Sequence, residues 1–149
     1  MKDIYYKMMK NVMFVFISML VLTGCSKSSY STADAIEKGD ITVTPSEIHN
    51  LERFEQFLQS ITKQQEDKIR VTSFTIEGDP IFQDLHYDGE NIQYSYDNTN
   101  DAFGGQDKGV KTEICTAITS KGKMQGKSEY YIAGCEDNFD YYLLGVSDR

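Results

Sequence analysis

The stretch from Thr75 to Asn98 constrains the fold most, because it has the pattern of a β-hairpin. Asp88-Gly89 lies between two alternating runs, and glycine adopts the positive φ that a two-residue turn needs. We therefore predict such a turn, with Leu85 opposite Ile92, and a sheet with one packed face and one wet face. The apolar face has Ile81, Leu85, Tyr87, Ile92, Tyr94 and Tyr96, and the polar face has Asp84, His86, Asn91, Gln93 and Ser95, with Phe82 as the apolar exception.

Two helices are predicted before the hairpin. Residues 32–39 suit a helix of at most two turns. Residues 45–62 suit a long helix, because Thr44 can cap it, Pro45 fits its first position and Glu47 completes a capping box. Its apolar stripe is spaced by three and four residues, which favours packing on a sheet over recruiting a partner. The stripe consists of Ile48, Leu51, Phe54, Leu58 and Ile61.

Further strands are predicted on both sides of the hairpin. Residues 68–77 are rich in β-branched side chains, and with the hairpin they make a three-stranded meander. The apolar positions of this strand change parity, which predicts either a bulge near Thr72 and Ser73 or burial on both faces. Residues 139–146 are expected to add a last strand.

A second hairpin is predicted from residues 110–119 and 128–135. If it is centred on Gln125, the facing pairs are Ile118 with Ile132, Ala117 with Ala133, and Cys115 with Cys135. Directly opposed antiparallel residues are close enough for a cystine. We therefore predict a disulfide between these two cysteines, with two buried free thiols as the alternative.

The first 25 residues predict export and lipid attachment. Three lysines precede an apolar run at 12–22, which is too short to span a bilayer. The sequence Leu22-Thr23-Gly24-Cys25 then resembles a bacterial lipobox, so we predict a signal peptide at 1–24 and a diacylglyceryl group on Cys25. An uncleaved membrane anchor is the alternative. Residues 25–31 are expected to be a flexible tether, and residues 32–149 a single domain.

The charge of the chain limits its partners. The formal net charge is -8, and the part from Cys25 onward carries 12 basic and 22 acidic residues, a net charge of -10. Such a surface argues against binding to nucleic acid or to anionic lipid. Membrane association is therefore expected to come from the lipid alone.

Several short motifs together resemble a known family. They are Leu51-Glu52-Arg53-Phe54, Ile76-Glu77-Gly78-Asp79-Pro80-Ile81, Tyr87-Asp88-Gly89, Tyr94-Ser95-Tyr96-Asp97-Asn98, Gly104-Gly105, and Cys115 with Cys135. With the lipobox, they resemble small lipoproteins of Gram-positive bacteria that are catalogued as a domain of unknown function (family 4362). The resemblance implies an extracytoplasmic location and a single domain. It implies no activity and no catalytic residue.

The loop from Asp97 to Gly109 is the first candidate site. Its oxygen-bearing side chains are those of Asp97, Asn98, Asn100, Asp101 and Asp107. Hard cations such as calcium prefer ligands of this type. The spacing departs from the EF-hand pattern, so a solvated, turn-rich loop is favoured over a metal site.

His86 is the second candidate, because Asp84 and Asp88 share its face of the strand and one of them could support it as a general base. No nucleophile, zinc or phosphate motif accompanies it, so a solvated histidine is favoured.

Tyrosines are the third candidate. Tyr130-Tyr131 and Tyr141-Tyr142 are adjacent pairs, so one ring of each should lie outside or at a rim. Exposed tyrosine suits recognition, although sheet packing explains most of the aromatic content.

The sequence therefore predicts an α+β domain, in which the long helix packs on one face of an antiparallel sheet of about five strands. We expect a lipid-anchored, extracytoplasmic module without catalytic activity or cofactor. It would bind a protein or cell-envelope ligand through the polar sheet face and the Asp97–Gly109 loop. The alternatives are an envelope hydrolase centred on His86 and a calcium-stabilised ligand-binding lipoprotein.

Overall fold

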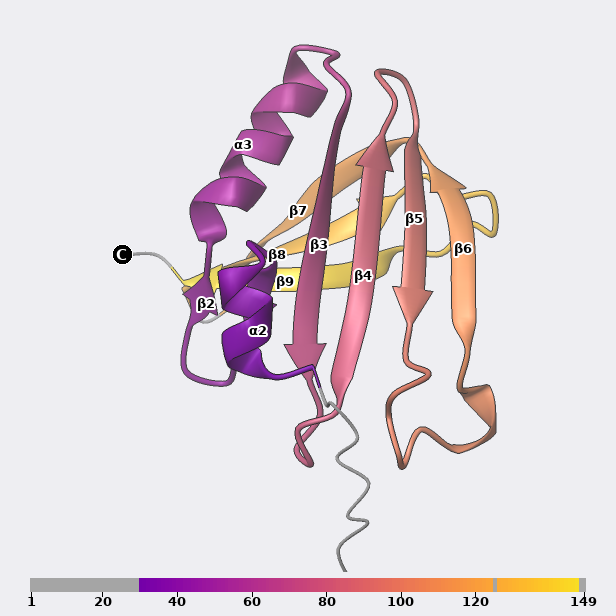
Figure 1. Cartoon of the computed structure of the whole chain (residues 1–149). Helices are drawn as coiled ribbons and strands as arrows, with labels where there is room; N and C mark the ends of the chain where they lie inside the picture. The colour runs from indigo at the N-terminus through magenta and orange to yellow at the C-terminus, as the bar shows by residue number, and fades with distance from the viewer. Residues whose placement is uncertain (1–29, 125, 148–149) are drawn as a thin grey trace, which may run out of the picture.

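The computed structural model describes residues 30–124 and 126–147, which form nine strands in two sheets (Figure 1). The larger sheet has the order β2-β1-β3-β4-β5-β6 and the smaller one β7-β8-β9. Paired strands are antiparallel, except that β1 is parallel to β3. The elements are α2 (Thr32–Glu37), β1 (Ile41–Val43), β2 (Ile48–His49), α3 (Leu51–Thr62), β3 (Asp67–Phe74), β4 (Pro80–Tyr87), β5 (Ile92–Asp97), η1 (Gly105–Asp107), β6 (Val110–Cys115), β7 (Ala117–Met124), β8 (Lys127–Ala133) and β9 (Tyr141–Ser147).

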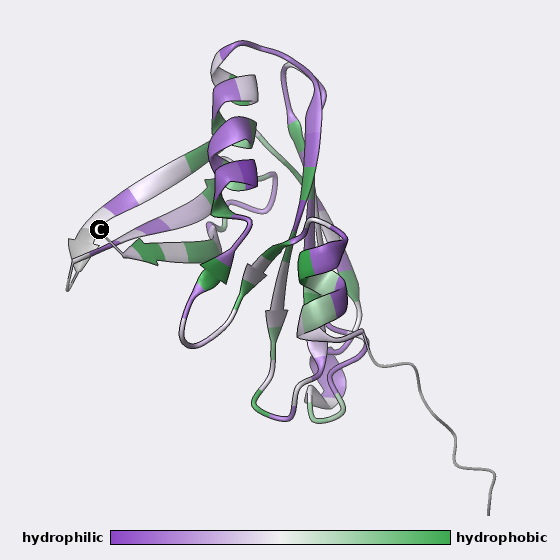
Figure 2. Cartoon of the chain, turned by 60° about the vertical axis from the view of Figure 1, so that its left-hand side comes forward, coloured by the Kyte–Doolittle hydropathy of each residue, from purple (hydrophilic) through white to green (hydrophobic). Residues whose placement is uncertain are grey.

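The predicted architecture of one sheet of about five strands under a long helix is wrong. The described residues are mostly β, and α3 is their one helix of more than two turns. Figure 2 shows the three-stranded sheet projecting from the six-stranded sheet, with α3 in the corner between them. The helix buries only Phe54 and Phe57, so it covers too little of the larger sheet. The second sheet supplies the rest of the cover.

The core lies between the two sheets and α3. The six-stranded sheet contributes the predicted apolar face of the hairpin, including Leu85 and Tyr94, which are 1% and 2% exposed. The three-stranded sheet contributes Ile132 and Leu144. The Phe54 ring of α3 meets Tyr130 of β8 edge to face, with 5.0 Å between centroids. Two sheets packed through alternating inward side chains are a common way to close a small β domain.

The central hairpin has the predicted faces but a different turn. Leu85 pairs with Tyr94 rather than with Ile92, so a four-residue loop replaces the predicted two-residue turn. The Asp88 carboxylate accepts hydrogen bonds from the backbone N–H groups of Glu90 (2.9 Å) and Asn91 (2.7 Å), a side-chain turn that competes with the tighter one. Because the register moves by two residues, every side chain stays on its predicted face.

The long helix begins at Leu51, six residues later than predicted. Thr44 does not cap it; its Oγ1 donates to the Glu47 carbonyl (2.8 Å) and accepts from the Glu47 N–H (3.1 Å). These bonds close a turn between β1 and β2, in which Ile48 pairs with Val43. The residues that resemble a capping box therefore stabilise the turn of the β1–β2 hairpin. The chain enters the helix through Asn50, which has φ +56°.

The other local predictions have mixed outcomes. The short helix is confirmed as α2, with Ser31 as its cap. In β3 no bulge interrupts the pairing with β4, and the second alternative, burial on both faces, is correct. Val71 faces the core, Thr72 faces the other side of the sheet, and both are 0% exposed.

The segment predicted as one strand over residues 110–119 is divided at Thr116. Its first half, β6, pairs with β5, and its second half, β7, pairs with β8 in the predicted register, with Ile118 opposite Ile132. The predicted disulfide between Cys115 and Cys135 is present. It closes the point where the chain passes from one sheet to the other. The predicted last strand is confirmed as β9.

The predicted signal peptide (1–24), the lipidation site Cys25 and the tether up to residue 29 lie outside the described residues. The described part begins at Tyr30, whose ring packs against Phe82 of β4 with 5.1 Å between centroids. Within the described ranges, no helix has the length and apolar character needed to cross a membrane.

Candidate functional site

The face of the six-stranded sheet that points away from the core is polar and open. The strand registers arrange its side chains in rows across β3, β4, β5 and β6, as cross-strand neighbours. We call two adjacent rows the floor rows. The first is Lys68, His86, Gln93 and Ile114, and the second is Arg70, Asp84, Ser95 and Thr112.

The floor rows line a cavity of about 980 Å³, which we call the outer groove. One wall comes from Tyr30, Lys38 and Asp40, at and beside α2, which lies over the front of the sheet in Figure 1. Arg53 of α3 adds to the rim, and Glu136 follows the disulfide at the β6 side. The volume is in the range of sites for small ligands.

An ion pair holds the β3 side of the floor rigid. Arg70 binds Asp84 through two hydrogen bonds, Nε to Oδ1 at 2.6 Å and Nη2 to Oδ2 at 2.8 Å. The Arg70 guanidinium also lies 4.8 Å from the centroid of the Phe82 ring. Hydrogen bonding to Asp84 raises the pKa of Arg70 above its ordinary value. The bidentate geometry fixes both side chains in one orientation.

A buried carboxylate supports the wall beside α2. Asp40 is 7% exposed, and its Oδ2 accepts hydrogen bonds from the Tyr30 hydroxyl (2.7 Å) and the Thr72 hydroxyl (2.6 Å). Burial, and then the hydrogen bond to Asp40 and its charge, raise the pKa of Tyr30 to about 12. The Lys38 ammonium lies 4.4 Å above the Tyr30 ring. This network attaches the start of the described chain to the groove.

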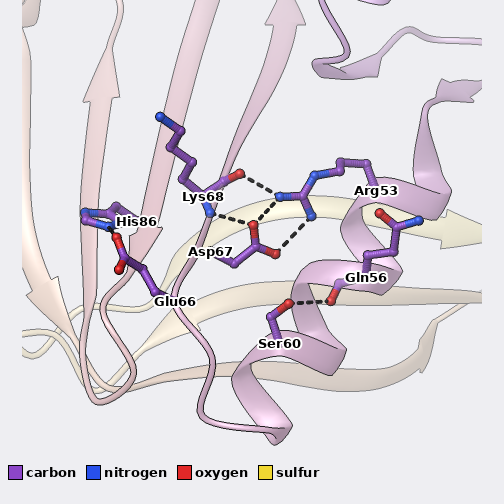
Figure 3. Close-up of polar contacts among 7 residues, drawn as sticks. All are labelled: Arg53, Gln56, Ser60, Glu66, Asp67, Lys68 and His86. Atoms are coloured by element: carbon purple, nitrogen blue, oxygen red, sulfur yellow. Dashed lines mark hydrogen bonds and ion pairs between the residues drawn. The ribbon is translucent and has the colours of Figure 1, made fainter.

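A second polar cluster fixes α3 beside β3 at the rim (Figure 3). Arg53 donates to the Asp67 carboxylate (Nη1 to Oδ2, 3.1 Å) and to the Lys68 carbonyl (Nη2, 2.7 Å). Burial acts to raise the pKa of Asp67, but hydrogen bonds from Arg53 and the Lys68 N–H outweigh it and hold that pKa below its ordinary value. The rim therefore does not depend on the helix packing alone.

The structure does not assemble the predicted group of His86, Asp84 and Asp88. The Asp84 carboxylate is bound by Arg70, and the Asp88 carboxylate turns to the hairpin loop. His86 instead pairs with Glu66, with 3.0 Å from Nε2 to Oε1 (Figure 3). Glu66 was missed because it lies 20 residues away in a polar turn, and no spacing in the sequence connects the two.

The Asp97–Gly109 loop lies outside the outer groove, since no described residue between 97 and 109 lines it. Of the predicted ligands, Asp97 is the last residue of β5, Asn98, Asn100 and Asp101 lie between β5 and η1, and Asp107 lies in η1. Three of them accept hydrogen bonds from backbone N–H groups within the loop: Asp97 from Thr99 (2.9 Å), Asn98 from Gly109 (2.8 Å) and Asp101 from Phe103 (2.8 Å). Among the described residues, no group of three or more His, Cys, Asp or Glu could hold a metal ion.

The tyrosine pairs divide between the two faces of the three-stranded sheet. Tyr130 packs on Phe54, and Tyr141 lies against Tyr94 with 5.1 Å between centroids. Tyr131 and Tyr142 contact each other at 5.5 Å, and Tyr142 is 51% exposed. The expectation that one ring of each pair lies outside or at a rim agrees with this arrangement. These rings do not line the outer groove.

Comparison with known proteins gives a family and no activity. No curated protein and no solved structure matches the chain. A family model described as "Domain of unknown function (DUF4362)" matches residues 38–131, which is more than half of the chain and contains both floor rows. The chain therefore belongs to the DUF4362 family of domains of unknown function.

Proposed function

We propose that the protein is a lipid-anchored, extracytoplasmic binding module without catalytic activity, and that the outer groove holds its ligand. One observation carries this proposal. The strands that bury their apolar side chains in the core present, on their other face, two rows of side chains that are polar except for Ile114 and that line a cavity of about 980 Å³. Concave sites with a few convergent polar groups are the usual form of ligand sites.

The floor suits recognition because its side chains on β5 and its Thr112 side chain on β6 carry no charge. Gln93, Ser95 and Thr112 can each donate and accept hydrogen bonds, and the described structure gives their side chains no hydrogen-bond partner in the protein. Long charged side chains that only keep a sheet soluble would fill this space. The smaller polar side chains of this floor leave space above them, so a ligand can reach their polar groups.

The anchor would place the groove near the membrane. Tyr30 lines the groove, and Cys25 precedes it by five residues. An extended chain gains at most about 3.6 Å per residue, so Tyr30 can stand no more than about 18 Å from the lipid-bearing cysteine. The ligand we propose is therefore a component found close to the outer membrane surface, such as a protein or envelope polymer.

A hydrolase is the second candidate, because His86 lies in the floor and is paired with Glu66. Such a pair could orient and polarise an imidazole as a general base. This candidate predicts that His86→Ala abolishes turnover of an envelope substrate and leaves the domain folded. Loss of ligand capture without any turnover by the wild type would favour the binding module.

Capture from detergent-solubilised envelope tests the proposal. The full chain, purified in mild detergent, serves as bait beside two variants. Ser95→Arg places a long cation in the middle of the floor, and Gln59→Arg places the same side chain on the exposed side of α3. We expect the wild type and Gln59→Arg to retain one stoichiometric partner, and Ser95→Arg to lose it while keeping the wild-type circular dichroism spectrum. Equal capture by all three proteins would contradict a role for the groove.

A further inference from the structure

Among the described residues, the charges of the outer groove that form no ion pair divide between its two sides. Lys38 and Lys68 line the cavity at the β3 side, and Glu136 lines it at the β6 side. Between them lie the uncharged side chains of the floor rows. From this arrangement we propose that the groove binds a short zwitterionic peptide segment of its ligand, with a carboxylate at the β3 side and an ammonium at Glu136. This inference rests on the proposed function of the groove.

Most of the other charges that line the groove are already engaged. Arg53 is bound to Asp67, and Arg70 to Asp84. Asp40 is buried and accepts two hydrogen bonds. Glu113 points to the core side of β6, where its carboxylate lies 3.9 Å from the Lys111 ammonium. These groups shape the groove and offer a ligand little free charge.

Three charged groups remain for a ligand. Among the described residues, the carboxylate of Glu136 and the ammonium groups of Lys38 and Lys68 form no ion pair. The Lys38 ammonium lies over the Tyr30 ring, with no carboxylate bound to it. Two free cations at one side are notable in a chain with a net charge of -8. A ligand that carries a negative and a positive end complements both sides at once.

The width of the groove sets the length of the ligand. From β3 to β6 there are three strand spacings of about 4.8 Å, or roughly 14 Å. An extended peptide gains about 3.3 to 3.6 Å per residue, so about four residues span this distance. The N–H and C=O groups of such a peptide would meet Gln93, Ser95 and Thr112, which offer both donors and acceptors. A neutral glycan could form hydrogen bonds with these three side chains, but it would leave the charges at the two sides of the groove without an opposite charge.

Isothermal titration of the full chain in detergent with tetraalanine tests the inference. Four probes are compared: the peptide with free termini, the N-acetylated form, the C-amidated form and the doubly blocked form. We expect the free peptide to bind most tightly, and each block to weaken binding about tenfold by removing one charge-assisted contact.

Two charge-removing variants assign the ends. In Glu136→Gln, N-acetylation should no longer weaken binding, while C-amidation still does. In Lys68→Gln the C-amidation penalty should shrink and the N-acetylation penalty remain. Glu55→Gln and Lys63→Gln, on exposed positions of α3 and its end, should behave as the wild type does.

Equal binding of the free and doubly blocked peptides would overturn the assignment of charges. The highest probe concentration is 10 mM, which is about 100 times a Kd of roughly 0.1 mM. If no probe binds at that concentration, the ligand is not a peptide. Either result is separable from failure of the proposed function. Capture that is lost in Ser95→Arg and kept in Gln59→Arg would still assign the groove as a binding site, with a ligand of another class.

Discussion

The two faces of the six-stranded sheet are built by the same strands and have opposite surroundings. On β4 and β5, Leu85 and Tyr94 are 1% and 2% exposed, while their neighbours His86 and Ser95 lie in the outer groove. Because successive side chains alternate between faces, every second residue contributes to folding and the rest are left for recognition. Stability and binding can therefore be changed almost independently in this domain.

Replacing a residue of the core face should have the largest effect. We expect Leu85→Ala to lower the free energy of unfolding by about 3 kcal/mol, since it removes buried methyl groups and leaves a cavity. His86→Ala, one residue away on the groove face, should change it by less than about 0.5 kcal/mol. Urea denaturation followed by circular dichroism measures both. Similar losses in the two variants would contradict the division between the faces.

Removing the disulfide should have an effect of nearly the same size. The two cysteines are separated by 20 residues, and closing a loop of that length stabilises a chain by roughly 3 kcal/mol in the chain-entropy model. We expect the double variant Cys115→Ser, Cys135→Ser to lose about this much in the same measurement. It should also weaken ligand capture, because Ile114 and Glu136 flank the cystine and line the groove. Full stability in the double variant would show that the junction between the sheets is held by packing alone.

At the wall beside α2, the Asp40 side chain contributes both to stability and to the outer groove. Asp40→Ala leaves the Tyr30 and Thr72 hydroxyls without their common acceptor, and the loss should be about 2 kcal/mol. Asp40→Asn keeps an acceptor oxygen and should lose less. The order of the two unfolding midpoints tests the network. A smaller loss of stability in the alanine variant than in the asparagine variant would contradict it.

The smallest effect concerns a surface contact that joins the two sheets. Asp137 accepts a hydrogen bond from the Lys111 ammonium (2.9 Å) and one from the Tyr141 hydroxyl. The bond from Tyr141, and then that from Lys111, lower the pKa of the Asp137 carboxyl to about 2, against an ordinary value of 3.8. The folded state thus favours the charged form, so its contribution to stability is present above pH 3.8 and is lost as the pH falls toward 2.

Comparison with Asp137→Asn across that window tests the contact. The wild type should have the higher unfolding midpoint at pH 5, and the difference should shrink steadily between pH 4 and pH 2. A difference that stays constant over this range would mean that the carboxylate charge does not stabilise the fold.

The faces of the sheet could be predicted because alternation depends on the local sequence alone. Leu85, Tyr87, Ile92 and Tyr94 are buried as the pattern predicts, although the turn chemistry of Asp88 moved the register by two residues. The cystine was also predictable, since it follows from the register of one hairpin. These features involve short-range pairings with a strict period.

The second sheet and the groove walls could not be predicted in the same way. Thr116 divides a continuous β pattern between two sheets, and nothing in its neighbours marks the change of partner. The capping-box pattern at Thr44 and Glu47 suits a helix and a turn equally, and only the pairing of β1 with β2 decides between them. The contacts of Tyr30 with Phe82 and of His86 with Glu66 join segments that the fold alone brings together.

If the outer groove binds a component of the cell envelope, it should be occupied on whole cells. Thiol labelling measures this occupancy, with a maleimide applied to Ser95→Cys and Gln59→Cys, first in the purified chain and then on whole cells. The chain without an introduced cysteine provides the background. We expect the labelling rate at position 95, divided by that at position 59, to fall at least about tenfold on cells, because the ligand covers the groove floor. The same ratio in both settings would contradict it.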